Sequence, residues 1–369
     1  MSGCSIQDRN QGNTLVNETA KLSQMNSNIL YVVRICAAWM VLLGHSFSFY
    51  QISFLKDQSY FPYIQNIGVV IFFELSGFLT AYSLSIKNVK YNYKFKEYAI
   101  QRATRIGKAY VPALLFVVVL DFMSICINKG NYRYLEEFTL KNFIGNIFML
   151  QNIPIVGKYI ITFGSARPLW TLSIEWWLYM TFGFVFLTLA NKKKITSREL
   201  IFISIISITP LSNLLGGRGE GLTICFLFGV FAFYIYKRLN IRYSFLLVWL
   251  ALTLLVISGI YKREAYCILI FVTVFGVLVA LLNWGKDKNG HKSKVLHFLA
   301  GYTFMLYLVH YSIIDFLYSC NLLVGSTCKM LFGIILSNIM SIIMYFIFEY
   351  SSLSEKMLRV RKNGFNKKN

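Results

Sequence analysis

Long apolar runs alternate with short polar connections along almost the whole chain. The runs cover about residues 29–50, 64–84, 109–128, 168–190, 200–215, 222–236, 244–261, 265–284, 296–319 and 329–349. Most are long enough to cross the roughly 30 Å of hydrocarbon in a bilayer. The fifth and sixth are short and are joined by a glycine-rich connection, which makes this pair the weakest part of the pattern. The pattern predicts an all-α polytopic membrane protein, a bundle of about ten transmembrane helices.

The polar segments divide the chain into three parts. Residues 1–28 lack the basic-then-apolar order of a cleaved signal peptide, so we expect a flexible N-terminal tail. Residues 29–350 form the transmembrane domain, and residues 351–369 a basic C-terminal tail. Within the domain, the moderately apolar stretch 141–163 is expected to be interfacial or re-entrant rather than a full span.

Basic residues gather in alternate connections between the apolar runs. They lie in segments 87–108, 192–198, 237–242, 286–294 and 356–368. Lysine and arginine mark the cytoplasmic side of a membrane protein. Ten spans with both termini in the cytoplasm satisfy this pattern.

Composition supports lipid as the surrounding medium. Of 369 residues, 56% are hydrophobic and 14% are charged, whereas soluble domains carry about 25% charged residues. The net charge of +21 is spread over short bursts instead of forming one basic surface, which argues against a nucleic-acid partner. The seven cysteines are scattered without a CxxC pair, so no metal site is expected.

A few ionisable residues fall at membrane depth. They are Arg34, His45, Glu74, Glu175, His310 and Asp315. Such side chains are costly in a bilayer, so a functional role is the default interpretation. Arg34 and His45 are eleven residues apart, which places them on one helix face about 16 Å apart. The alternative is a snorkelling arginine and a satisfied core histidine.

Other residues suit particular chemistry. Ser76 and Gly77 place small side chains inside a span, where helices can approach closely. Arg102 and Arg105 are at i and i+3, on one face of a helix. Paired guanidinium groups suit phosphate oxygens, which indicates an anionic ligand on the cytoplasmic side.

Four segments, in this order, resemble acyltransferase family 3, the bacterial membrane O-acyltransferases. That family has an arginine and a histidine in its first helix and FF-x-x-SGF in its second, here Phe72–Phe78. It also has a cytoplasmic Arg-x-x-Arg, a W-S/T-L-S-x-E helix, here Trp170–Glu175, and a late Tyr-Leu-x-His. The resemblance covers roughly residues 28–350. One departure is that the proline expected soon after Arg-x-x-Arg comes late, at Pro112.

The resemblance implies transfer of an acyl group, usually acetyl from acetyl-coenzyme A, to a sugar hydroxyl of a cell-surface polysaccharide or its lipid-linked precursor. It implies acyl-coenzyme A as a co-substrate, with no permanently bound cofactor. The expected partners are membrane lipid, the donor and the glycan acceptor, and the oligomeric state stays open.

The resemblance also assigns roles to residues. It makes His45, Arg34 and Glu175 the catalytic set, with His45 as the essential histidine. It places Arg34, Arg102 and Arg105 at the coenzyme A site. Whether His45 acts as a base or carries the acyl group is left open. For Glu175, a structural ion pair with an arginine is the alternative.

Four further residues are expected to bind substrate or support the site: Glu74, Ser76, Trp170 and His310. Glu74 stands where the family pattern is apolar, and its role is open. Trp170 is either a sugar platform or part of an interfacial aromatic belt. His310 is either the late family histidine or a satisfied core histidine, and Asp315 is expected to be an outer helix-end residue.

Two other classes of function compete with acyl transfer. A transporter or flippase for a lipid-linked glycan would also need many spans and intramembrane charges, but it predicts two related halves. The sequence shows no such internal symmetry. A non-catalytic scaffold leaves the intramembrane histidine, glutamate and arginine residues without a role.

Overall fold

The computed structural model describes residues 22–350 apart from 51–63, 92, 129, 152, 154–155, 217–218, 239–248, 255–265, 287 and 321–324. Within this part the chain is helical and contains no strand. The helices are α2 (Gln24–Tyr50), α3 (Ile64–Tyr91), α4 (Phe95–Ile127), α5 (Leu140–Ile147), α6 (Trp170–Ala190), α7 (Ser197–Ile206), α8 (Ile208–Leu215), α9 (Leu222–Arg238), α11 (Ile268–Trp284), α12 (Lys294–Cys320) and α13 (Ser326–Tyr345). A π-helical turn, Phe346–Tyr350, continues α13.

Six helices of the described part are long and apolar enough to cross a membrane: Gln24–Tyr50, Ile64–Asn88, Phe95–Ile127, Arg167–Ala190, Lys294–Cys320 and Ser326–Tyr350. A seventh span results if α7 and α8, bent by 46°, count as one. Every expected run except 244–261 coincides with a helix or with this bent pair, and most of 244–261 lies outside the described residues. The expected all-α class is confirmed.

The first boundary differs from the expectation. Helix α2 begins at Gln24, so residues 24–28 are helical instead of belonging to a tail. Ser23 explains the start, since its hydroxyl accepts a 3.0 Å hydrogen bond from the backbone N–H of Asn26 and thus caps the helix. Residues 1–21 and the expected tail 351–369 lie outside the described residues.

Helix α4 joins two segments that the sequence analysis treated separately. Its 33 residues contain both the basic segment with Arg102 and Arg105 and the apolar run that follows. Pro112 lies inside the helix. The late proline therefore does not separate the arginines from the span, and one helix carries them from the basic end into the bundle.

Among its described residues, the stretch 141–163 holds no helix long enough to span a membrane. It contains the eight-residue α5 and short turns. Thr139 caps α5 by accepting a hydrogen bond from the backbone N–H of Asn142. The Tyr110 hydroxyl ties this segment to α4 through a 2.9 Å bond to the carbonyl of Asn146.

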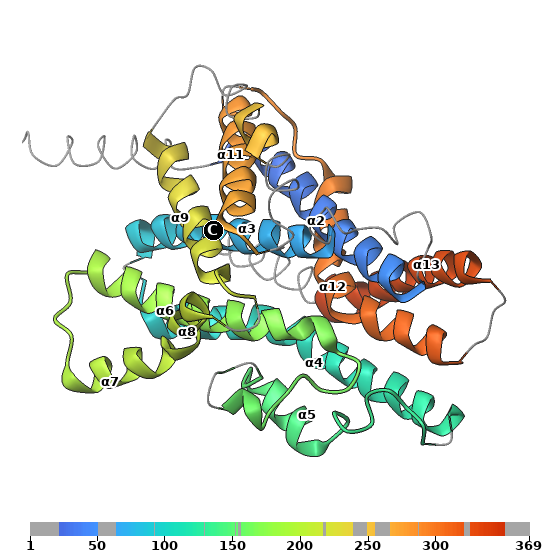
Figure 1. Cartoon of the computed structure of the whole chain (residues 1–369). Helices are drawn as coiled ribbons and strands as arrows, with labels where there is room; N and C mark the ends of the chain where they lie inside the picture. The colour runs from blue at the N-terminus through green and yellow to red at the C-terminus, as the bar shows by residue number, and fades with distance from the viewer. Residues whose placement is uncertain are drawn as a thin grey trace, which may run out of the picture.

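Glycines allow α3 and α9 to cross at close range. A Cβ atom on Gly77 would collide with the backbone of Phe226, and one on Gly229 with the backbone of Glu74. Small residues permit this approach in apolar bundles. Helix α12 packs against α2, α4 and α13 (Figure 1). The cavity described next is lined from α2, α3, α4, α6 and α12.

Candidate functional site

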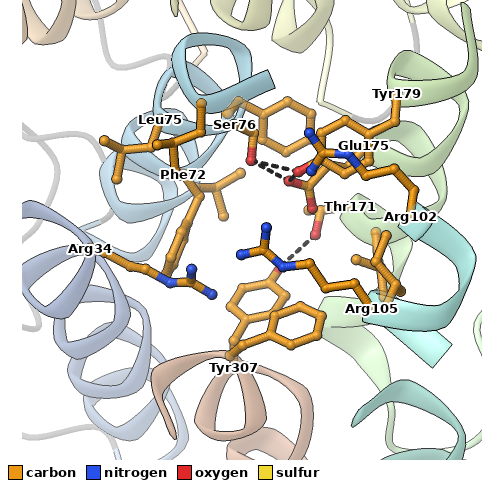
Figure 2. A pocket seen from close by; sticks show the side chains of 16 residues that line it. Arg34, Phe72, Leu75, Ser76, Arg102, Arg105, Thr171, Glu175, Tyr179 and Tyr307 are labelled. Carbon is orange, nitrogen blue, oxygen red and sulfur yellow. Dashed lines mark hydrogen bonds between the residues drawn. The ribbon is translucent and has the colours of Figure 1, made fainter. Parts of the chain in front are cut away.

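A cavity of about 100 Å³ lies among these five helices. That volume holds several water molecules. Its lining is mainly apolar, with aromatic side chains from α3 and α12. The charged side chains in the lining are Arg34, Arg102, Arg105 and Glu175. Figure 2 shows the three guanidinium groups pointing into the same space from α2 and α4.

These four side chains give the cavity a cationic character. Three guanidinium groups and one carboxylate leave a net charge of +2 in the lining. Uncompensated charge in an apolar surrounding is costly, and a bound anion offsets that cost. Guanidinium groups form bidentate hydrogen bonds with phosphates and carboxylates. The arrangement is therefore suited to an anionic ligand.

Arg102 is held firmly by its neighbours. Its Nη2 donates a 3.0 Å hydrogen bond to the Thr80 hydroxyl. Its guanidinium lies 4.4 Å from the ring centre of Tyr179 and 5.4 Å from that of Tyr98. Cation–π contacts of this kind are stronger where water is excluded. Arg102 thus has a fixed position at one wall of the cavity.

Glu175 is held by two hydroxyl groups. Its Oε1 accepts hydrogen bonds from Ser76 and, at 2.5 Å, from Tyr179. The Tyr179 hydroxyl also lies 3.0 Å from the Ser76 oxygen. These donors come from α3 and from one turn further along α6, so they fix the carboxylate (Figure 2). In the described part of the chain, Glu175 makes neither an ion pair nor an imidazole contact.

Arg34 differs from Arg102 in its surroundings. Its Nε is buried and has no hydrogen-bond partner among the described residues. Leaving a buried donor of a charged group unpaired is unfavourable. Arg34 is therefore a candidate to bind a ligand that enters the cavity.

The two histidines lie outside the cavity lining. His45 and His310 face each other from α2 and α12, with ring centres 5.4 Å apart. Tyr307 lines the cavity, and its ring centre is 6.1 Å from that of His310. The Tyr307 hydroxyl also bonds to the Thr171 hydroxyl and to the Pro168 carbonyl. Tyr307 thus lies between the arginine cavity and the histidine pair.

The structure brings together five of the expected site residues in one cavity, namely Arg34, Ser76, Arg102, Arg105 and Glu175. His45 and His310 form a separate pair.

Glu74 and Trp170 lie elsewhere. Glu74 is fully buried against α9, where its Oε1 is 3.9 Å from the Cys225 sulfur. Trp170 is buried at the start of α6, with its ring centre 6.5 Å from that of Tyr266.

Sequence reasoning did not predict the contacts that Tyr179, Thr80 and Tyr307 make at the cavity. The spacing of Tyr179 was a usable signal, because residues four apart on a helix lie on one face and Tyr179 is four residues after Glu175. Thr80 had no comparable signal, since its contact with Arg102 joins two different helices.

A second polar cluster lies at the other end of α4. The Tyr132 hydroxyl is 2.8 Å from Asp121 Oδ1 and 3.1 Å from Asp315 Oδ2. Ser165 donates to Asp121 from both its backbone N–H and its hydroxyl, and Arg133 lies 3.6 Å from Asp315. Asp315, in the last turns of α12, is 1% exposed and joins that helix to this cluster.

The helices of membrane-spanning length are consistent with a polytopic membrane protein. The cationic cavity is suited to binding an anionic ligand. A family model described as "Acyltransferase domain", that of acyltransferase family 3, matches residues 28–348. The chain belongs to this family, as the motifs predicted.

One curated relative supports the same assignment. The chain is 29% identical over 190 residues to a protein of Shigella phage Sf6 named "O-acetyl transferase". The match covers 51% of this chain and 54% of that protein, so the chain spans about half the length of the curated relative it matches. No solved structure matches the chain.

Proposed function

We propose that this protein is an integral membrane O-acyltransferase. It moves an acyl group, in the simplest case acetyl, from acyl-coenzyme A to a sugar hydroxyl of a cell-surface polysaccharide or of its lipid-linked precursor. Family membership and the name of the phage relative support acyl transfer. The observation that carries the proposal is the convergence of Arg34, Arg102 and Arg105 on one cavity.

The arginines suit the donor. Coenzyme A carries several phosphate charges, and charge-assisted hydrogen bonds to guanidinium groups are among the strongest in proteins. The acyl end of the donor extends further into the bundle, past the guanidinium groups that bind its phosphates. Arg105, whose side chain is exposed as well as lining the cavity, is placed to meet them.

The proposed reaction needs a base and a partner for the developing negative charge. The acceptor hydroxyl attacks the thioester carbon and its proton passes to an imidazole. The C–S bond then breaks, and the imidazolium returns the proton to the sulfur, so that coenzyme A leaves as a thiol. His45 is the proposed base or acyl carrier, because neutral imidazole accepts protons near pH 7. The partner for the oxyanion must lie near His45, because Arg34 is about 16 Å away along the helix and is assigned to the phosphates of the donor. Apolar side chains such as Phe72 and Phe304 line the cavity and restrict water.

The proposed topology follows the basic segments. Ten spans with both termini in the cytoplasm place segment 87–108 at the inner face, next to the cytoplasmic donor. The glycan acceptor then approaches from the opposite side or from the bilayer. The proposed location is the bacterial inner membrane.

The test uses purified protein in lipid vesicles with radiolabelled acetyl-coenzyme A and a surface glycan. The proposal predicts that label moves to the glycan and that free thiol appears in equal amount. Deleting the gene should lower the acetyl content of the cell's polysaccharide. Glycan transport without consumption of acetyl-coenzyme A would contradict the proposal and support the transporter alternative.

A further inference from the structure

His310 is buried inside the bundle, and among the described residues only one of its ring nitrogens has a hydrogen-bond partner. Its side chain is 0% exposed. Nδ1 lies 2.9 Å from the carbonyl oxygen of Leu306 and 3.0 Å from that of Tyr307. Nε2 is buried and has no hydrogen-bond partner among the described residues. The two nitrogens of this ring therefore have different surroundings.

These surroundings select the tautomer. Carbonyl oxygens only accept hydrogen bonds, so Nδ1 of His310 must carry the hydrogen. In a neutral imidazole the other nitrogen is then an acceptor with a free lone pair. His310 thus presents a fixed acceptor, Nε2, inside the bundle. A buried acceptor without a partner is unfavourable, which indicates that a donor reaches it in some state of the protein.

The ring of His45 lies beside the ring of His310. The two ring centres are 5.4 Å apart and the ring planes are inclined by 32°. Ring nitrogens that face each other at this separation lie about 3 Å apart, within hydrogen-bond distance.

The carboxylates of Glu175 and Asp315 already have partners. Glu175 accepts from Ser76 and Tyr179, and Asp315 is bonded to Tyr132 and lies beside Arg133. In the described part of the chain, Nε2 of His310 is the buried ring nitrogen left without a partner.

We propose that His310 is a positioning residue for His45. Nε2 of His310 accepts a hydrogen bond from one ring nitrogen of His45, and this leaves the other nitrogen of His45 unprotonated towards the substrate. The arrangement follows the logic of a base held in the right tautomer by a third group. The inference rests on the proposed acyl transfer and adds a second histidine to it.

The test distinguishes the effect of the acceptor atom Nε2 from the effect of the volume of the ring. In His310→Gln an amide oxygen can take the place of Nε2, whereas His310→Leu keeps the volume and removes the acceptor. A histidine methylated at Nε2, introduced at position 310, keeps the ring and Nδ1–H and blocks the acceptor. The control is His297→Gln, a change in α12 at a ring that packs against Tyr31.

Turnover, the KM for acetyl-coenzyme A and the thermal unfolding midpoint are measured for each protein in vesicles. We expect kcat to fall about tenfold or more in the leucine and methyl-histidine variants, the equivalent of one hydrogen bond. The KM should change less than twofold, and glutamine should restore part of the turnover. Normal turnover of the methyl-histidine variant, or equal losses for leucine and glutamine, would overturn the inference.

The same experiment separates this inference from the function on which it rests. If wild-type protein and His297→Gln fail to acetylate any glycan, the proposed function fails. If both are active and the three His310 variants match them, acyl transfer stands and the role of His310 is wrong.

Discussion

The hydroxyl of Tyr179 donates a 2.5 Å hydrogen bond to Glu175 Oε1 one turn away on α6, and the ring of the same tyrosine lies 4.4 Å from the guanidinium carbon of Arg102. One aromatic side chain therefore fixes both a carboxylate and a cation at the cavity wall. The Ser76 hydroxyl completes the support of the carboxylate from α3. Three helices thus hold the two charges at a set separation.

Glu175→Gln removes the negative charge from a lining that holds three guanidinium groups. We expect turnover to fall more than tenfold, because the carboxylate that Ser76 and Tyr179 orient is lost. Donor affinity should stay equal or rise, since the lining becomes more cationic. Steady-state kinetics and equilibrium binding of acetyl-coenzyme A measure the two effects separately. A weaker affinity with normal turnover would show that Glu175 acts on binding alone.

Arg105→Ala should weaken donor binding by about 1.5–3 kcal/mol, the value of a charge-assisted hydrogen bond. Arg105→Lys should restore only part of it, because lysine lacks the bidentate fork. Arg102→Ala should also lower thermal stability, since Arg102 contacts Thr80 and the Tyr179 ring.

Calorimetric titration with acetyl-coenzyme A measures these losses. The control is Arg198→Ala, which removes a positive charge from an exposed site outside the cavity. If the Arg105 and Arg198 variants lose affinity equally, the arginine pair does not form the donor site.

The topology can be tested with single cysteines in a cysteine-free background. Cysteines introduced at the positions of Lys193 and Lys288 should react with a thiol reagent from the cytoplasmic side. Cysteines at the positions of Asn131 and Gly219 should react from the opposite side. This expectation rests only on the basic residues in the connections between the spans. Labelling of Lys193 and Lys288 from opposite faces would rule out the ten-span arrangement.

Gly77→Ala should destabilise the protein by about 1–3 kcal/mol through overpacking. The added methyl group would collide with the backbone of Phe226, where α3 and α9 cross. Gly107→Ala is the matched control, because a Cβ at Gly107 meets no atom within 4 Å. This control should be neutral, or stabilising by up to about 1 kcal/mol, as alanine favours helix. Thermal unfolding in detergent compares the two, and equal midpoints would contradict the close crossing.

The positions of most helices along the chain could be predicted from the sequence, but the face that each helix buries could not. Helices that are apolar all round carry little amphipathic signal to show which side is buried against what. Glu74 and Ser76 illustrate this point. They are two residues apart and therefore do not share a helix face. Ser76 lines the cavity, while Glu74 is buried against α9.

Contacts between distant segments also escaped the sequence. Asp121 lies inside an apolar run, where an acidic residue should have been suspected of a role. Its partners Tyr132 and Ser165 come from later connections, and Tyr132 also bonds Asp315 of α12. No regular spacing along the chain indicates that these residues come into contact. Arg102 and Arg105 could be predicted as a pair, because both stand on one helix three residues apart.

The most direct test of the account is acetyl transfer by His45→Gln protein in vesicles, compared with wild type and His45→Ala. Glutamine keeps much of the size and one hydrogen bond of histidine but cannot take up a proton or carry an acyl group near pH 7. If His45 is the base or the acyl carrier, both variants should lose acetyl transfer to the glycan while remaining folded and inserted. Near-normal turnover by His45→Gln would contradict the claim that this histidine carries the chemistry.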